Sequence, residues 1–437
     1  MLLDFQFYNF RSFKEPATLS LMAKLSDKEL LDNVMAPELP GISKQRFLRA
    51  AAVYGANAAG KSNIIRSMFV LVKMIRHSHL EELGKEMPHD PFLLDSESKE
   101  QPTGYRVRFV SEGVRYHYDL IHDLERVLEE RLSAFPKGSE QVWLDRYWDE
   151  ESKRYHYEET PESSPILLKD KALKGIKGNT LYMSYVANVQ FQEAIEPVYT
   201  WFRDVVDVKN LAESSYTYLR MNDTIRYAVN NHHEKVEELL KRADFGVKSL
   251  VLDQRDLSDE ELNRYPEEDD PSKGVRKMVE LELTHGSTNG EEVLFEMKNE
   301  STGTLRMLSL AGPWLEMIER GKVMFLDELE TSLHPLLVRE LVAMVLDPEI
   351  NRSGAQLVVA THDPLLLDMS LFRRDQVWFT EKNGLGESTL YPLTDFKPTV
   401  RDSLIRGYLS GRYGAIPFIP QRLVEADAKK EIISAET

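Results

Sequence analysis

The segment Gly55-Ala56-Asn57-Ala58-Ala59-Gly60-Lys61-Ser62 satisfies the pattern G-x-x-x-x-G-K-[ST] at every fixed position. Glycines in such a loop let the backbone turn its amides inward around phosphate groups. Lys61 has the length to reach the β and γ oxygens, and Ser62 can hold Mg²⁺. The segment, together with the adjoining Asn63, therefore predicts a site for a nucleoside triphosphate, ATP, and its magnesium ion.

The flanking residues give this loop the context that the pattern requires. Residues 48–54, LRAAAVY, predict a buried strand that enters the loop, and residues 62–76 predict a helix that leaves it. The N-terminus of such a helix points its free N–H groups at the phosphates. An ordinary glycine turn before a helix would rarely have both neighbours, so we predict an α/β fold with a phosphate-binding loop.

A second acidic motif follows far downstream, where the apolar residues 323–326 end in Asp327 and Glu328. In a strand of this kind the first carboxylate holds Mg²⁺ and the second is placed to take a proton from the attacking water. Another predicted strand, residues 356–360, leads to His362. At this spacing His362 can reach a γ-phosphate, although a histidine at a strand end is also a common packing or capping residue.

A third element lies between these motifs, at Ser301-Thr302-Gly303, directly before an apolar helix. Ser301 and Gly303 at a helix N-terminus predict an anion site, although alone they would indicate only a helix cap. The order along the chain is phosphate loop, long insert, Ser-Gly helix start, Asp-Glu strand and His strand. That order is found in ABC-class ATPases, where the Ser-Gly element closes on the nucleotide of a second protomer.

The chain resembles the ABC-class ATPases of the overcoming-lysogenization and SMC/RecF-like group, most closely the RloA or AbiL-like ATP-binding subunits of bacterial abortive-infection systems. The resemblance covers nearly the whole chain, and it departs from transporters in having STG in place of LSGGQ. It is carried by FQFYNFRSFKEPATLSL (residues 5–21), GANAAGKS (55–62), PFLLD (91–95), FLDELETSLHP (325–335), ATHDPLLLD (360–368) and GYLSGRYGAIPFI (407–419).

The resemblance implies an ATP-driven dimer or higher homo-oligomer that controls a separately encoded effector, often a nuclease, in defence against phage. It assigns catalytic roles to Lys61, Glu328 and His362, metal binding to Ser62 and Asp327, and a role across the dimer to Ser301 and Gly303. It also places Arg11 near the phosphates, although an exposed arginine at a strand end is an equal interpretation. An SMC/RecF-like ATPase in DNA repair or maintenance, and an ATP-binding scaffold with little turnover, remain alternatives.

Composition limits the partners. Fifty-five Lys and Arg against 72 Asp and Glu give a formal net charge of −17, which opposes broad attraction to nucleic acid, so any such contact is expected to be local. The basic run 169–178 is more typical of a solvated face. There are no cysteines and no apolar run approaches the roughly 20 residues of a membrane helix, so we expect a cytoplasmic protein without a membrane partner.

Three regions follow from the positions of the motifs. Residues 1–122 are predicted to form an N-terminal ATPase lobe with the phosphate loop, and residues 123–274 a mostly helical insertion. Residues 275–437 are predicted to form a C-terminal ATPase lobe with the Ser-Gly element, the Asp-Glu strand and His362. The expected fold is an ABC-type ATPase head with a mixed sheet and an antiparallel β subdomain. Only 75 residues follow His362, too few for a nuclease domain beside the rest of the ATPase sheet, so the effector chemistry is expected in another protein.

Overall fold

The computed structural model describes residues 1–158, 166, 176–210, 216–243, 245–256, 277–399 and 402–417. Its centre is a six-stranded mixed sheet in the order β11-β15-β16-β5-β17-β18, with only β18 antiparallel to its neighbour. The strands are β5 (Ala50–Gly55), β11 (Val206–Asn210), β15 (Val323–Asp327), β16 (Gln356–Ala360), β17 (Val377–Lys382) and β18 (Ser388–Pro392).

The central strands of this sheet are buried on both faces. All residues of β5, β15 and β16 are buried, as their unbroken apolar runs predict for parallel strands covered on both sides. Along β5, Ala51 and Val53 belong to one apolar core, whereas Ala52 and Tyr54 belong to the other. Helix α1 (Lys61–His77) covers the first face, and α8 (Thr302–Arg320) and α9 (Pro335–Leu346) cover the second.

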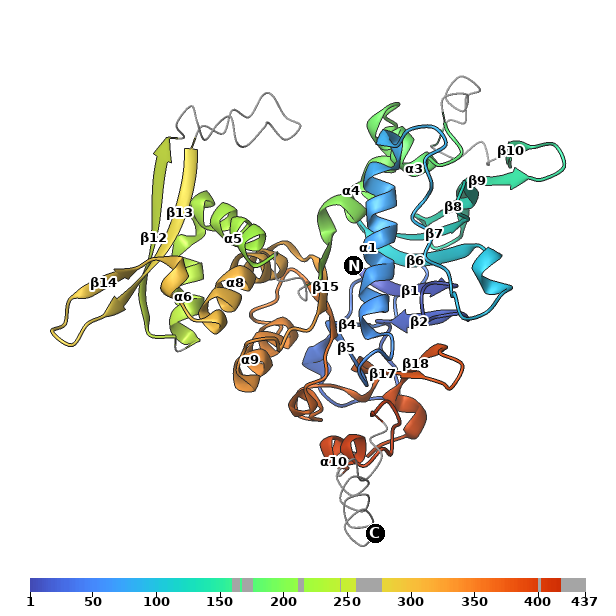
Figure 1. Ribbon diagram of the computed structural model, residues 1–437. Helices are drawn as coiled ribbons and strands as arrows, with labels where there is room; N and C mark the ends of the chain where they lie inside the picture. The colour runs from blue at the N-terminus through green and yellow to red at the C-terminus, as the bar shows by residue number, and fades with distance from the viewer. Residues whose placement is uncertain are drawn as a thin grey trace, which may run out of the picture.

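A seven-stranded antiparallel sheet lies on the far side of α1, so that α1 is packed between the two sheets (Figure 1). Its order is β10-β9-β8-β7-β6-β1-β2. The two sheets also touch directly, since the rings of Phe5 and Phe325 meet edge to face with centroids 6.4 Å apart. The strands are β1 (Leu2–Tyr8), β2 (Ala17–Ser20), β6 (Thr103–Ser111), β7 (Val114–His122), β8 (Val127–Phe135), β9 (Gln141–Asp149) and β10 (Arg154–Tyr157).

The structure confirms the predicted α/β class, the mixed sheet and the antiparallel β subdomain, but it corrects the content of residues 123–274. The first part of that range is not helical, because β8, β9 and β10 extend the same sheet as β6 and β7. The boundary after residue 122 therefore cuts through a continuous sheet. The physical reason is the register between β7 and β8, which pairs residues 115–122 with residues 127–135 across a short turn.

Helices do follow these strands. They are α3 (Tyr182–Asn188), α4 (Glu196–Thr200), α5 (Tyr216–Tyr227) and α6 (His233–Arg242). The hydroxyl of Thr224 on α5 is inserted into the hydrogen-bond ladder of α8, where it donates to Leu308 O (2.6 Å) and accepts from Gly312 N–H (3.0 Å). This insertion lies next to Pro313, which cannot donate to the ladder, so α5 holds α8 where that helix is weakest.

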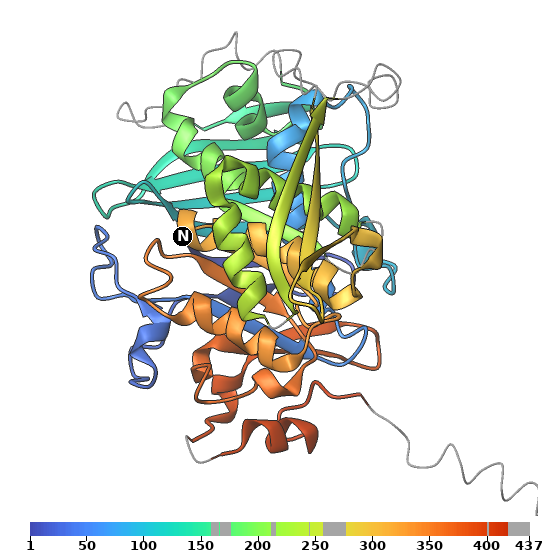
Figure 2. The same cartoon turned by 90° about the vertical axis from the view of Figure 1, so that its left-hand side faces the viewer.

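A third sheet lies beside these helices. Figure 2 shows its long hairpin standing in front of α5 and α6. It contains β12 (Val247–Asp256), β13 (Lys277–Gly286) and β14 (Glu292–Phe295), all antiparallel. The turn between β13 and β14 spans residues 287–291, where Ser287 N–H donates to Glu291 O over 2.8 Å. A short pair, β3 (Val34–Met35) with β4 (Phe47–Leu48), and helix α10 (Leu404–Leu409) complete the regular elements of the described residues.

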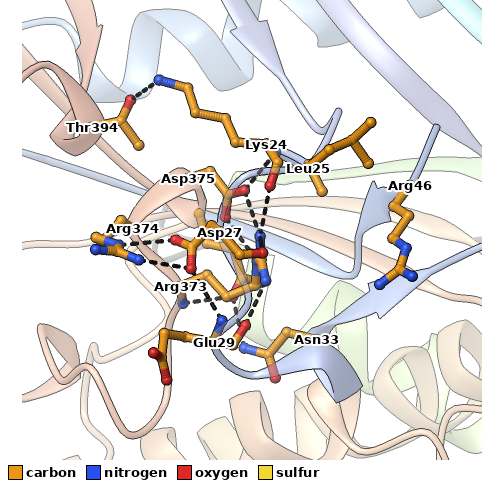
Figure 3. Close-up of polar contacts among 12 residues, drawn as sticks. Lys24, Leu25, Asp27, Glu29, Asn33, Arg46, Arg373, Arg374, Asp375 and Thr394 are labelled. Atoms are coloured by element: carbon orange, nitrogen blue, oxygen red, sulfur yellow. Dashed lines mark hydrogen bonds and ion pairs between the residues drawn. The ribbon is translucent and has the colours of Figure 1, made fainter. Parts of the chain in front are cut away.

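A buried polar network ties the segment after β2 to the start of β17 (Figure 3). Arg373 forms two hydrogen bonds with Asp375, both of 2.9 Å, and the second carboxylate oxygen of Asp375 also accepts from Lys24 N–H at 2.7 Å. Beside it Arg374 binds Asp27 through both of its carboxylate oxygens. These side chains hold residues 24–27 against the mixed sheet.

Most of the basic run 169–178 and the end of the GYLSGRYGAIPFI segment lie outside the described residues. Within the part of the chain that is described, no helix is both long enough and apolar enough to span a membrane.

Candidate functional site

The phosphate-loop sequence connects the end of β5 to the start of α1. Gly60 caps α1 with φ 112°, in the region that favours glycine. A Cβ added to Gly60 would come within 2.8 Å of Ser388 Oγ and 2.9 Å of the Phe13 ring. A Cβ on Gly55 would lie 2.6 Å from the carbonyl oxygen of Thr380. Both glycines are therefore required by the close packing beneath the loop.

The loop is held from below by β17 and β18. The hydroxyls of Thr380 and Ser388 both donate to the carbonyl oxygen of Ala59, each over 2.8 Å. On the rim, Asn57 and Ala58 are exposed, and Ala58 has a φ of 60°. Helix α1 has no side-chain cap, so its first N–H groups face the loop and suit an anion.

Lys61 lies inside the loop. Its Nζ donates to the carbonyl oxygens of Gly55 (2.8 Å) and Ala56 (3.1 Å), and the residue is 8% exposed. Burial lowers the pKa of Lys61, while the negative charges of Asp327, Glu330 and Glu328 oppose this shift. The ammonium group is thus desolvated and faces acidic side chains, and phosphate oxygens would supply it with stronger partners than the two carbonyls.

Asp327 lies at the end of β15. In the sheet, one strand, β16, separates β15 from β5. Asp327 is 2% exposed, and its Oδ1 has no hydrogen-bond partner within the described structure. Burial raises the pKa of Asp327, the charge of Glu328 adds to this, and a hydrogen bond from Ser62 and the charge of Lys61 oppose it.

A hydroxyl and an unpartnered buried carboxylate oxygen are the hard ligands that Mg²⁺ takes from proteins, so Ser62 and Asp327 fit a magnesium ion. The described residues contain no group of three or more His, Cys, Asp or Glu side chains with metal-binding geometry. A magnesium ion here would accordingly need other ligands, and the phosphates of a nucleotide and water supply them in sites of this kind.

Glu328 follows β15 directly and has a left-handed backbone, with φ 51°. Its N–H donates to the carbonyl oxygen of Ala360 at the end of β16 (3.0 Å). Its own carbonyl oxygen accepts a hydrogen bond from Arg306 on α8 (2.9 Å). The backbone of Glu328 is therefore fixed from two sides, while its half-buried carboxylate accepts a hydrogen bond from Thr331 Oγ1 over 3.4 Å.

His362 lies just beyond β16, which separates β15 from β5. Its ring is 57% exposed, and Nδ1 lies 2.8 Å from Oε1 of Glu330. The sequence prediction assigned no role to Glu330, whose side chain is 9% exposed. The sheet order therefore brings the loop, Asp327, Glu328 and His362 to one edge, because the carboxyl ends of parallel strands share that edge.

The structure does not bring Ser301 and Gly303 to the phosphate loop of the same chain. Ser301 is the N-cap of α8 and accepts from Thr304 N–H at 3.1 Å, and its side chain is exposed. Gly303 packs against Ser332, with an added Cβ 3.1 Å from Ser332 O. Helices α8 and α1 lie on opposite sides of β15 (Figure 1).

Arg11 lies in the tight turn after β1, with φ 53°. Its main-chain N–H donates to Asp90 O (2.7 Å), and its Nε lies 3.1 Å from Asp90 Oδ2. The adjacent Ser12 contacts the loop, since Asn63 Nδ2 donates to Ser12 Oγ over 2.8 Å. The turn is thus attached to the start of α1, and the role of Arg11 toward phosphate remains a prediction.

Sequence reasoning missed Ser12, Thr380, Ser388, Arg306 and Glu330. Each acts through a partner that lies 22 to 329 residues away in the sequence. Single hydroxyls of this kind have no local pattern. For Glu330 the only signal was its place in the quoted segment 325–335, which gave no indication of a contact with His362.

The fold and the residues at this edge define an ABC-class P-loop ATPase domain. The sequence model of the family described as "AAA domain, putative AbiEii toxin, Type IV TA system" matches residues 50–368, and the chain belongs to this family. No curated protein matches the chain.

Two solved structures illustrate the structural likeness. The "SMC head domain from Thermotoga maritima" is 14% identical, with 90% of this chain and 98% of that chain covered and a TM-score of 0.40. An Smc head domain with an extended coiled coil, bound to the C-terminal domain of ScpA, from Pyrococcus furiosus is 10% identical, with 90% and 96% covered and the same TM-score of 0.40.

Proposed function

We propose that this protein binds ATP with Mg²⁺ and hydrolyses it at the edge of the mixed sheet. The observation that carries the proposal is the arrangement around Asp327. This buried carboxyl group accepts a hydrogen bond from Ser62, senses the charge of Lys61, and keeps its Oδ1 without a partner in the described structure. A carboxylate in that position, with a phosphate-binding loop above it, suits metal-assisted phosphoryl transfer better than any structural role.

Each side chain then has a separate task. Lys61 and the N–H groups of α1 hold the phosphate oxygens and offset the charge that develops as the bond between the γ-phosphorus and the β,γ-bridging oxygen breaks. Ser62 and Asp327 would hold Mg²⁺, which would supply charge compensation for the phosphates when bound. Glu328 accepts the proton of the attacking water. His362 contacts the γ-phosphate from the neighbouring strand.

We propose further that two chains form each complete site. Ser301 and Gly303 are at the exposed N-terminus of α8, on the other side of β15 from their own phosphate loop. A helix N-terminus suits an anion, so this element is available to the γ-phosphate that a second copy holds. A twofold arrangement would satisfy both sites at once. ATP would then close the dimer, and hydrolysis would reopen it.

The biological role that we propose is an ATP-driven switch in a bacterial anti-phage system, which acts in the cytoplasm on a separately encoded effector. The support is the family description, which names a putative toxin of a type IV toxin–antitoxin system, together with the resemblance of the chain to abortive-infection ATPases. This step rests on analogy within a family and not on the geometry of the site.

The direct test is phosphate release by the purified protein. With ATP and Mg²⁺ the wild-type protein should release phosphate, chelation by EDTA should stop it, and Lys61→Ala should lose both nucleotide binding and turnover. ATP binding without measurable hydrolysis would contradict the proposal and indicate a scaffold. Strong stimulation by DNA would instead indicate an ATPase of DNA repair or maintenance.

A further inference from the structure

Glu330 and His362 form a close pair at the catalytic edge. Oε1 of Glu330 accepts a hydrogen bond from the main-chain N–H of His362 (2.7 Å) and also lies 2.8 Å from Nδ1 of the ring. Glu330 belongs to the turn after β15, and His362 follows β16, the parallel neighbour of β15. One carboxylate oxygen thus fixes both the backbone and the ring of the histidine.

This contact decides which ring nitrogen is free. A carboxylate oxygen can only accept, so Nδ1 carries the proton in the contact with Glu330. Nε2, on the opposite edge of the ring, is then the nitrogen available to a ligand. The ring is 57% exposed whereas Glu330 is 9% exposed, so the anchor is nearly buried while the ring reaches solvent. In the doubly protonated ring, Nε2–H can donate to a phosphate oxygen while Nδ1–H stays on Glu330.

Apart from its charge, which opposes the lowering of the Lys61 pKa, Glu330 has no assigned part in holding the phosphates, the metal or the water. Lys61, Ser62, Asp327 and Glu328 account for the phosphates, the metal and the water. The second oxygen of Glu330, Oε2, is buried and has no hydrogen-bond partner within the described structure. In metal sites, a carboxylate that accepts a hydrogen bond from a ligand histidine fixes the orientation of its ring. The nearly buried carboxylate of Glu330 contacts His362 in the same way, through one oxygen.

We propose that Glu330 is a positioning residue, which holds the His362 ring through Nδ1–H so that the Nε2–H edge faces the γ-phosphate of ATP. The inference rests on the proposed function, and it makes the discrimination between ATP and ADP depend on Glu330. ADP lacks the γ-phosphate, so its binding should be independent of both residues. If Glu330 had a purely structural role, its replacement would instead weaken the binding of ATP and of ADP to the same extent.

The test is a double-mutant cycle in which the measured quantity is the ratio of the dissociation constants of ADP and of an ATP analogue. Dissociation constants of ADP and of the β,γ-imido analogue of ATP are measured with Mg²⁺ for the wild type, Glu330→Ala, His362→Ala and the double variant. Each single variant should reduce the preference for the ATP analogue by about tenfold, and leave ADP unchanged, because the ring loses its fixed orientation or is absent. In the double variant, the preference for the ATP analogue should fall by no more than it does in either single variant.

Two further variants serve as controls. Glu330→Gln retains an oxygen acceptor in the same place and should preserve most of the preference, which guards against misfolding of the alanine variant. Glu340→Ala removes an exposed glutamate on α9 and should change nothing. Additive losses in the double variant, or an equal loss of ADP binding in Glu330→Ala, would overturn the role of Glu330. Wild-type protein with no preference for the ATP analogue over ADP would instead overturn the proposed function.

Discussion

Arg306 donates a hydrogen bond from Nη2 to the main-chain oxygen of Glu328 over 2.9 Å. Arg306 is buried, at 8% exposure, in the first turns of α8, the helix that begins after Ser301. Glu328 has a left-handed backbone at that point. One side chain therefore links the helix that we assign to the partner's nucleotide with the residue that we assign as the base in its own site.

Replacement of Arg306 should slow hydrolysis without weakening ATP binding. In Arg306→Lys the charge remains but the planar guanidinium is lost, so the carbonyl of Glu328 is held less firmly. Because a small misplacement of a catalytic group costs up to about a hundredfold, we expect kcat to fall at least about tenfold with the ATP dissociation constant unchanged. Arg320→Lys, at the exposed end of the same helix, is the matched control. Wild-type kcat in Arg306→Lys would rule out this coupling.

Glu328→Gln should bind ATP and fail to turn it over. The amide keeps the shape of the side chain but cannot accept a proton, and general-base catalysis contributes roughly 10² to 10⁴ in rate. Single-turnover phosphate release measures the chemical step, and filter binding of ATP measures affinity. Glu340→Gln serves as the control. A variant that releases phosphate at the wild-type rate would exclude Glu328 as the base.

Asp327→Asn should make the ligand-free protein more stable, and it should reduce the stabilisation that Mg-ATP gives. Burial raises the pKa of Asp327 from its ordinary value, so the folded protein binds this proton more tightly than the unfolded chain does. The stability from that protonation is complete below the unfolded pKa and is lost as the pH rises through the folded pKa. At neutral pH the ionised carboxylate is therefore a cost, and its removal should raise stability by about 1 kcal/mol.

Thermal melting with and without Mg-ATP checks this prediction. The melting temperature of the wild type should rise on addition of Mg-ATP. This increase should become smaller as the pH is lowered, and because the pKa of Asp327 is raised, the loss should begin at a higher pH than it would for an aspartate with an ordinary pKa. Asp327→Asn should start higher and gain less. A variant that melts below the wild type in the absence of nucleotide and metal would show that the carboxylate has a structural role.

The elements that carry the ATPase motifs could be predicted from sequence because their signals are local. The buried runs of β5, β15 and β16 are apolar without interruption, and each ends at a polar motif. The helix after Lys61 follows at once. Since parallel strands align their carboxyl ends, the positions of Asp327 and His362 relative to the loop follow from the topology that these motifs imply.

Strands β8 and β9 were missed because they carry buried charges. Glu130 and Arg146 are fully buried partners, with Arg146 Nε 3.2 Å from Glu130 Oε2, and Glu130 also accepts from the N–H groups of Tyr182 and Met183. A charged residue at a core position breaks the alternation that indicates a strand. Its compensation comes from α3, about 50 residues away, and cannot be inferred from the strand itself.

The same limit applies to the supports of the site. Ser388 holds the phosphate loop and Glu330 holds His362, but both contacts exist only once strands distant in the sequence are neighbours in the sheet. The functional atoms of an ATPase can be recognised by their spacing, whereas the side chains that position those atoms depend on the folded chain.

The shared site is the central claim, and mixing two inactive variants tests it. Lys61→Ala damages the phosphate loop, and Ser301→Arg blocks the helix N-terminus that should complete the site of the partner. Each variant alone should be inactive in both sites. A mixed dimer contains one site with an intact loop from one chain and an intact Ser301 from the other.

The decisive measurement is ATP hydrolysis by the two variants mixed in equal amounts after their subunits have exchanged. Random pairing makes half of the dimers mixed, each with one intact site of two, so we predict about one quarter of the wild-type rate. Mixed dimers whose formation is demonstrated by differential tags, yet which hydrolyse no more ATP than either variant alone, would contradict the shared site.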